Sequence, residues 1–119
     1  MKRLTQGFTL VELMIVIAII GVLCAIAFPW FRDNTQRSQN SACLAEAKGY
    51  MATAVADLAA GRPANPPQPV SCEAGTVAPT AANYQNNDRV IFTPRLTGNP
   101  AVLKESNCWS GNARCELAP

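Results

Sequence analysis

An uninterrupted apolar segment near the amino terminus constrains this chain more than any other feature. No charged residue occurs from Leu13 to Phe31. A helix of that length extends about 28 Å at ~1.5 Å per residue, which is close to the thickness of the hydrocarbon core of a bilayer. Glu12 lies just inside the amino end of the segment. A simple membrane anchor has no need of a carboxylate there, so Glu12 is the first candidate functional residue.

The residues before the apolar segment predict its orientation and its processing. Lys2 and Arg3 precede it, and by the positive-inside rule they hold the amino end in the cytoplasm and direct the rest of the chain outward. An ordinary secretory signal is cleaved after its apolar region. Here the candidate site, Gly7–Phe8, comes before that region, so the apolar segment would remain after cleavage. An uncleaved signal anchor with the same orientation is the alternative.

The composition argues against an enzyme and against a nucleic-acid-binding protein. The chain has no histidine, which removes the commonest general base and the commonest metal ligand. We therefore expect no catalytic residues, no metal and no cofactor. The formal net charge is only +2, which makes DNA a weakly supported partner. Four basic residues could form a patch for DNA: Arg89, Arg95, Lys104 and Arg114. Three nearby acids, Asp88, Glu105 and Glu116, would reduce the positive charge of that patch.

The cysteines indicate an oxidising compartment. Of the five, Cys24 lies in the apolar segment and is expected to stay free. Four cysteines in a small domain behind a membrane segment favour two disulfides. A zinc site is the alternative, but it would need all four thiolates, and no C-x2-C pair is present. The sequence alone leaves three pairings open for these four residues: Cys43, Cys72, Cys108 and Cys115.

The segment after the apolar stretch is typical of an amphipathic helix, which we expect over about residues 32–60. Gly61 provides a C-cap for this helix, and Pro63 prevents its continuation. The apolar residues of the expected face recur at helical spacing: Leu44, Met51, Val55 and Leu58.

The remainder of the chain predicts a loop followed by a small sheet. Residues 61–89 are rich in Pro, Ala and Asn and are expected to be irregular. Within them, Asn86, Asn87 and Asp88 form a polar turn, with calcium ligation as the less favoured alternative. Short antiparallel strands that pack on the helix are expected at three places: Val90–Thr93, Ala101–Lys104 and near Cys108–Ser110.

Over roughly residues 1–40 the chain resembles the amino-terminal segment of type IV pilins and their relatives, in the sequence GFTLVELMIVIAIIGVLCAIAFPWFRDNTQRSQ. The resemblance implies that a prepilin peptidase cuts between Gly7 and Phe8 and that Phe8 is then N-methylated. It also implies that Glu12 acts in fibre assembly. Two residues fall where the family has helix-loosening positions: Gly21 and Pro29.

The fold that this resemblance implies is α+β. Its expected parts are a leader at 1–7, a membrane and filament-core helix at 8–31, and a periplasmic or extracellular head at 32–119. The head would contain the second half of the helix, the loop and, at 90–119, a small antiparallel sheet with a Cys-bounded end loop. That end loop, together with the short separation of the last two cysteines, favours one of the three pairings: Cys43–Cys72 and Cys108–Cys115.

The function that the resemblance implies is that of a non-enzymatic subunit of a type IV pilus, or fimbrium. Such a subunit is inserted in the bacterial inner membrane as a prepilin. Its partners would be the prepilin peptidase and methyltransferase, the pilus assembly machinery and further copies of itself in a helical filament. The extracellular filament would serve adhesion, twitching motility or DNA uptake. A minor pilin of the same system and a type II secretion pseudopilin are the alternatives.

Overall fold

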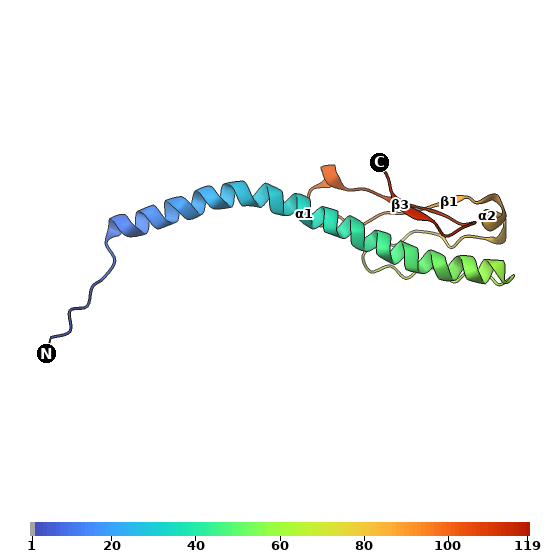
Figure 1. The fold of residues 1–119 in the computed structure, drawn as a ribbon, viewed down its shortest axis with the longest axis horizontal. Coiled ribbons are helices and arrows are strands. Elements are labelled where there is room, and N and C mark those ends of the chain that lie inside the picture. The colour runs from blue at the N-terminus through green and yellow to red at the C-terminus, as the bar shows by residue number, and fades with distance from the viewer. Residues whose placement is uncertain (1) are drawn as a thin grey trace. The chain divides into compact units, whose positions relative to one another are not determined.

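The computed structural model describes residues 2–119. The chain divides into two compact units, one ending at Phe31 and one spanning Arg32–Pro119. Figure 1 shows the fold. Its elements, in chain order, are α1 (Leu10–Ala59), α2 (Ala81–Asn86), β1 (Arg89–Phe92), the 3-10 turn η1 (Pro100–Val102), β2 (Ser106–Trp109) and β3 (Cys115–Leu117).

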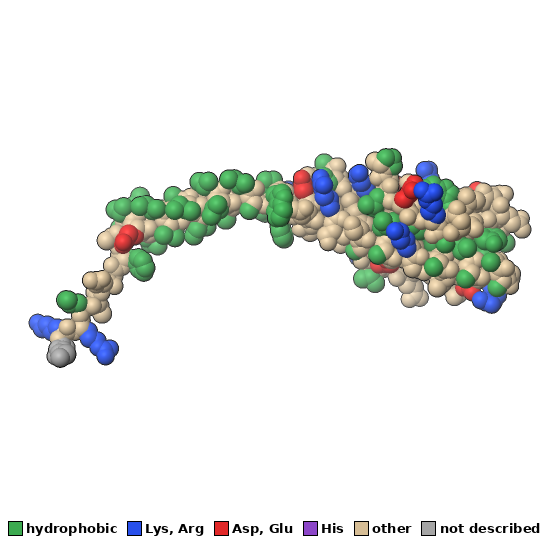
Figure 2. Space-filling model, in the orientation of Figure 1, with side chains coloured by type: hydrophobic (Ala, Val, Ile, Leu, Met, Phe, Trp, Pro, Cys, Tyr) green, Lys and Arg blue, Asp and Glu red, His purple; other side chains and the backbone are tan. Residues whose placement is uncertain are grey.

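The first unit is the apolar part of α1 with the segment that precedes it. Hydrophobic side chains cover this part of the helix (Figure 2), and the large ones from Leu10 to Phe31 are each 50–75% exposed. Among the described residues, α1 is the one helix with a stretch long and apolar enough to cross a membrane, and none of that stretch is buried. Such exposure is not that of a core helix in a soluble domain, so these side chains need lipid or other protein around them.

The second half of α1 is the long helix of the head, the unit Arg32–Pro119, and the rest of the head packs against it. Its sequence is rich in Ala, the strongest helix former. The helix ends as expected, since Gly61 adopts a left-handed conformation with φ 76°. The buried face is centred on small residues, with Leu44 and Val55 packed only partly at its edges. Its fully or almost fully buried apolar members are Cys43, Ala47, Met51, Ala54 and Leu58.

A three-stranded antiparallel sheet with the order β1-β2-β3 completes the head. In β1–β2, Val90 lies opposite Cys108, and in β2–β3, Cys108 lies opposite Cys115. Phe92, 3% exposed, packs edge-on against Tyr50 of α1 with ring centroids 5.8 Å apart. Burial raises the pKa of the Tyr50 hydroxyl, which stays neutral and donates to the carbonyl of Asn65 at 2.7 Å.

Two predictions about local structure are wrong. The segment Ala101–Lys104 is not a strand, because Asn99 accepts from the Ala101 amide and Pro100 opens the 3-10 turn. The third strand is β3 instead. The interval 61–89 is not irregular throughout, because Thr80 begins α2 with a capping box that it forms with Asn83.

A buried polar residue, Gln36, fastens the loop between β1 and η1 to α1. Gln36, fully buried, accepts from the amides of Thr97 and Gly98 at 2.9 and 3.0 Å. Its amide nitrogen donates to the Arg95 carbonyl at 3.2 Å and to the side chain of Asn40 at 3.1 Å. The side-chain oxygen and nitrogen of Gln36 are therefore both bonded in the interior of the head, which satisfies the rule for buried polar groups.

Gly98→Ala is expected to destabilise the head by about 2–3 kcal/mol, the upper part of the range for overpacking. A Cβ at this position would clash with the backbone oxygen of Arg32, which cannot move without bending α1. The matched control is Gly49→Ala. Its Cβ meets nothing within 4 Å, and the gain in helix propensity should stabilise the head by about 0.5–1 kcal/mol. Urea unfolding of both variants measures these changes, and an unchanged midpoint for Gly98→Ala would contradict the close approach.

Candidate functional site

The amino-terminal site is built around a capping interaction at the start of α1. Glu12 accepts from the backbone amide and the hydroxyl of Thr9 at 2.8 and 3.0 Å, while the Glu12 amide donates to the Thr9 hydroxyl at 3.2 Å. This is a capping box, which satisfies amides at the helix start that would otherwise lack partners. The Glu12 carboxylate therefore has a partner inside its own chain. Sequence reasoning missed Thr9, although the pattern T-x-x-E signals it.

The proposed scissile bond lies outside the helix. Gly7 and Phe8 precede the first residue of α1, the Phe8 side chain is 94% exposed, and nothing lies within 4 Å of a Cβ placed on Gly7. A protease needs an extended and unobstructed backbone on both sides of the bond that it cuts. The structure places Gly7, Phe8 and Glu12 within one short segment in which the irregular backbone before Leu10 gives way to helix.

The two residues assigned to helix loosening both lie inside α1, which is helical throughout Leu10–Ala59. Pro29 has no amide hydrogen to donate, so the carbonyl of Ala25 loses its usual helical partner. A Cβ at Gly21 would meet nothing within 4 Å, so no steric requirement for glycine exists within the described chain. A role for Gly21 and Pro29 in helix opening is therefore a proposal about the filament.

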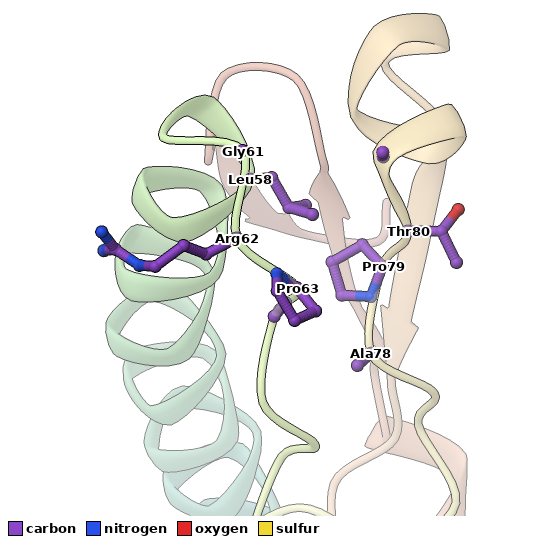
Figure 3. Close-up of a pocket in the computed structure, with 9 residues that line it drawn as sticks. Leu58, Gly61, Arg62, Pro63, Ala78, Pro79 and Thr80 are labelled. Atoms are coloured by element: carbon purple, nitrogen blue, oxygen red, sulfur yellow. The ribbon is translucent and has the colours of Figure 1, made fainter.

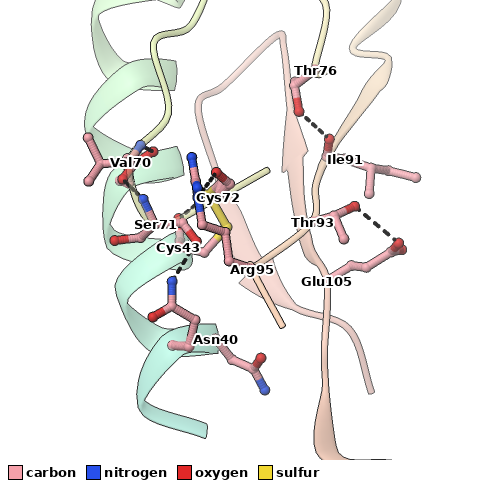
Figure 4. Close-up of a disulfide and its surroundings, with 12 residues drawn as sticks. Asn40, Cys43, Val70, Ser71, Cys72, Thr76, Ile91, Thr93, Arg95 and Glu105 are labelled. Atoms are coloured by element: carbon pink, nitrogen blue, oxygen red, sulfur yellow. Dashed lines mark hydrogen bonds between the residues drawn. A yellow bond between two sulfur atoms is a disulfide. The ribbon is translucent and has the colours of Figure 1, made fainter. Parts of the chain in front are cut away.

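The first disulfide, Cys43–Cys72, joins α1 to the loop that follows it (Figure 4), with both cysteines fully buried. Polar contacts fasten the same stretch of loop. Glu46 accepts from the amides of Val70 and Ser71, each at 2.8 Å, and Gln39 donates to the Ser71 carbonyl at 2.7 Å. Residues 39, 43 and 46 lie on one face of the helix. Sequence reasoning missed Gln39 and Glu46, because nothing in a polar helical residue shows which loop it will contact.

The second disulfide, Cys108–Cys115, closes the hairpin between β2 and β3. Both pairings are those that the family resemblance implies. Asn87 fastens the closed loop, because its side-chain oxygen accepts from the Gly111 amide at 2.9 Å. Asn87 also ends α2 in a left-handed conformation, with φ 53°, and the neighbouring Asp88 accepts from Asn83 at 2.8 Å. These contacts make Asn87 and Asp88 a polar turn at the end of α2, whose last residue is Asn86. No cluster of metal-ligating side chains occurs among residues 2–119.

A cavity of about 430 Å³ in the head lies between the end of α1 and the segment that leads into α2 (Figure 3). It is lined mainly by Leu58, proline and alanine side chains. Arg62 borders it, but its guanidinium points away from the cavity and pairs with Asp57 at 2.7 Å. The cavity therefore presents no convergent set of chemical groups, and catalysis finds no support there.

The basic residues considered for DNA are divided among different contacts. Arg95 donates to the carbonyl of Cys72 at 3.2 Å, and Arg114 pairs with Glu116 at 3.2 Å. Lys104 instead lines a groove with Arg37 of α1, a residue that sequence reasoning did not single out.

Comparison with known proteins agrees with the amino-terminal site. Residues 2–28 match the family model of the prokaryotic N-terminal methylation motif. The chain is 54% identical over 55 residues to a type IV major fimbrial protein of Dichelobacter nodosus, covering 46% of this chain and 35% of the relative. It is 53% identical over 49 residues to a type IV major pilin protein of Neisseria gonorrhoeae, and the match covers 41% of this chain and 30% of that relative. The fimbrial protein of Neisseria meningitidis serogroup B matches with 53% identity over 49 residues, which are 41% of this chain and 29% of that relative. No solved structure matches the chain.

The segment around Gly7 and the apolar start of α1 thus define a protein with a prepilin-type amino terminus. Over this segment the chain is similar to type IV major pilins and major fimbrial proteins. The chain spans about a third of the length of the curated relatives that it matches.

Proposed function

We propose that this chain is a structural subunit of a type IV pilus. The observation that carries the proposal is the combination at its amino terminus: an accessible Gly7–Phe8 bond, a capped Glu12 and an apolar helix with no partner inside the described chain. A surface that is equally suited to lipid and to further apolar helices can exchange one for the other. That exchange is what a subunit needs when it passes from a membrane into a helical fibre.

The proposed pathway begins with insertion of the prepilin in the bacterial inner membrane. The prepilin peptidase cuts at Gly7–Phe8, the new amine of Phe8 is methylated, and the assembly machinery adds the subunit to an extracellular filament. The methylation motif over residues 2–28 supports the processing steps. Adhesion, twitching motility and DNA uptake are the uses that such a filament could have.

A minor pilin and a type II secretion pseudopilin are the alternative roles. The two disulfides of the head and the Cys-bounded end loop favour the pilus over the pseudopilus. Surface fibres sheared from cells and separated by electrophoresis distinguish the major from the minor role. A major pilin is the main band of the fibre, whereas a minor pilin is present at a small fraction of it.

Processing provides the direct test of the proposal. We expect mass spectrometry of fibre protein to show a chain that begins at Phe8 and carries one added methyl group. Gly7→Leu should block cleavage, because a bulky side chain shields a bond that is now open, and the uncut prepilin should accumulate in the membrane. Gly49→Ala, an open glycine far along the chain, is the control that should be cut normally. A mature chain that still contains residues 1–7 would contradict the proposed site.

A further inference from the structure

A groove of about 380 Å³, lined by both apolar and basic residues, lies on the head between α1 and the segment that leads into β2. A hydrogen bond joins its two walls, because Asn40 of α1 donates to the Val102 carbonyl of η1 at 2.8 Å. The groove is therefore formed without a ligand. Its lining residues are Arg37, Asn40, Ser41, Ala101, Val102, Lys104 and Leu117.

Two cations border this groove without an acidic partner. The side chains of Arg37 and Lys104 are exposed, and no ion pair between either of them and an acidic residue occurs within the described range 2–119. The acid one turn before Arg37, Asp33, instead accepts from Asn99 at 2.6 Å. Elsewhere on the head, Arg62 pairs with an acid. The groove thus has an excess of positive charge and would be complementary to an anion.

The position of Arg37 along the chain limits which anions it meets first. Arg37 follows Phe31, the end of the apolar segment, by only about 9 Å of helix at ~1.5 Å per residue. The headgroup layers of a bilayer extend about 5–8 Å beyond the hydrocarbon core on each side. A long arginine or lysine side chain reaches back over a further few ångströms to place its charge among headgroups. Phosphate groups of lipids are therefore within reach of Arg37 and of Lys104, which lines the same groove.

We propose that this groove binds the phosphodiester headgroup of an anionic phospholipid of the phosphatidylglycerol type. Arg37 and Lys104 contact the phosphate. The bound lipid holds the base of the head at the membrane surface until the subunit is extracted. The inference rests on the membrane-inserted stage of the proposed function.

The test uses the full chain, one copy per lipid nanodisc, and follows acylation of its three lysines by peptide mass spectrometry. Discs of phosphatidylcholine alone are compared with discs that also contain phosphatidylglycerol. We expect phosphatidylglycerol to slow acylation of Lys104 about fivefold, the factor typical of a basic side chain at an anionic lipid surface. Lys48, which is exposed on α1 away from the groove, should react at the same rate in both discs.

Two variants that each lose one positive charge distinguish binding of the lipid in the groove from general attraction of the head to an anionic surface. Arg37→Gln should reduce the protection of Lys104 to less than about twofold, whereas Arg89→Gln, outside the groove, should leave it unchanged. Equal protection in the Arg37→Gln chain would overturn the proposal, as would equal rates at Lys104 in both kinds of disc. Protection by free glycerol phosphate in phosphatidylcholine discs would assign the groove to a soluble phosphate and also overturn it. Failure of the chain to enter discs would instead contradict the membrane stage of the proposed function.

Discussion

Glu12→Ala is expected to leave membrane insertion and cleavage at Gly7–Phe8 largely intact and to reduce the number of fibres by more than about tenfold. Cleavage would create a positive amine at Phe8, and methylation leaves it charged. We propose that the amine of an incoming subunit pairs with Glu12 of a subunit already in the fibre. Without the carboxylate, that amine is buried with no partner, at a cost of about 3–5 kcal/mol.

The structure adds a step to this proposal. In the described chain Glu12 already has partners, the amide and hydroxyl of Thr9. These contacts offset part of the cost of a carboxylate in an apolar environment. Pairing in the fibre therefore requires the Glu12 carboxylate to accept an additional donor or to exchange one. An apolar helix surface has little preference of its own for an axial position, so a single charge pair can determine the register.

Glu12→Gln separates the register role from the capping role. The glutamine oxygen can still accept from the Thr9 amide, so the helix start is retained, but the charge is absent. We expect Glu12→Gln to lose fibres as Glu12→Ala does. Electron microscopy of cells, with immunoblots of membrane and sheared fractions, measures the outcome. Normal fibres with Glu12→Gln as the main subunit would reduce Glu12 to a capping residue.

Removal of the Cys43–Cys72 disulfide is expected to destabilise the head by roughly 3–4 kcal/mol. The disulfide closes a sequence separation of 29, and the loop-entropy relation assigns that stabilisation to a loop of this size. The Cys108–Cys115 disulfide closes a separation of only 7, so its removal should cost about 2–2.5 kcal/mol. The first disulfide also holds the loop that Glu46 and Gln39 contact, and its loss exposes those hydrogen bonds to water.

The double variants Cys43→Ala/Cys72→Ala and Cys108→Ala/Cys115→Ala test this order. Urea unfolding of the full chain in detergent, followed by near-ultraviolet circular dichroism, gives the two free energies of unfolding. A greater loss for the hairpin disulfide, or no loss for either, would contradict the prediction. Non-reducing peptide mapping of the unmodified chain provides the check on pairing, since a peptide that links Cys43 to Cys108 would overturn the assignment.

Much of the fold follows from short-range patterns in the sequence. The apolar segment, the end of α1 shortly before Gly61, and strands β1 and β2, within a residue or two of their expected positions, depend on hydropathy and on local backbone preferences. The same holds for the amino-terminal site, because Gly7, Phe8 and Glu12 are neighbours along the chain and need no tertiary contact to come together.

Only the tertiary structure decided the features that depend on long-range contacts. Gln36 is polar, yet it is buried because it bonds backbone groups about sixty positions later in the chain. The position of β3 and the 3-10 turn at Pro100–Val102 depend on where the hairpin closes against the helix. The groove at Arg37 and Lys104 joins residues far apart in sequence. Local preferences specify which residues can form a helix or a turn, but the energy of burying polar groups is determined by partners that only the folded chain brings near.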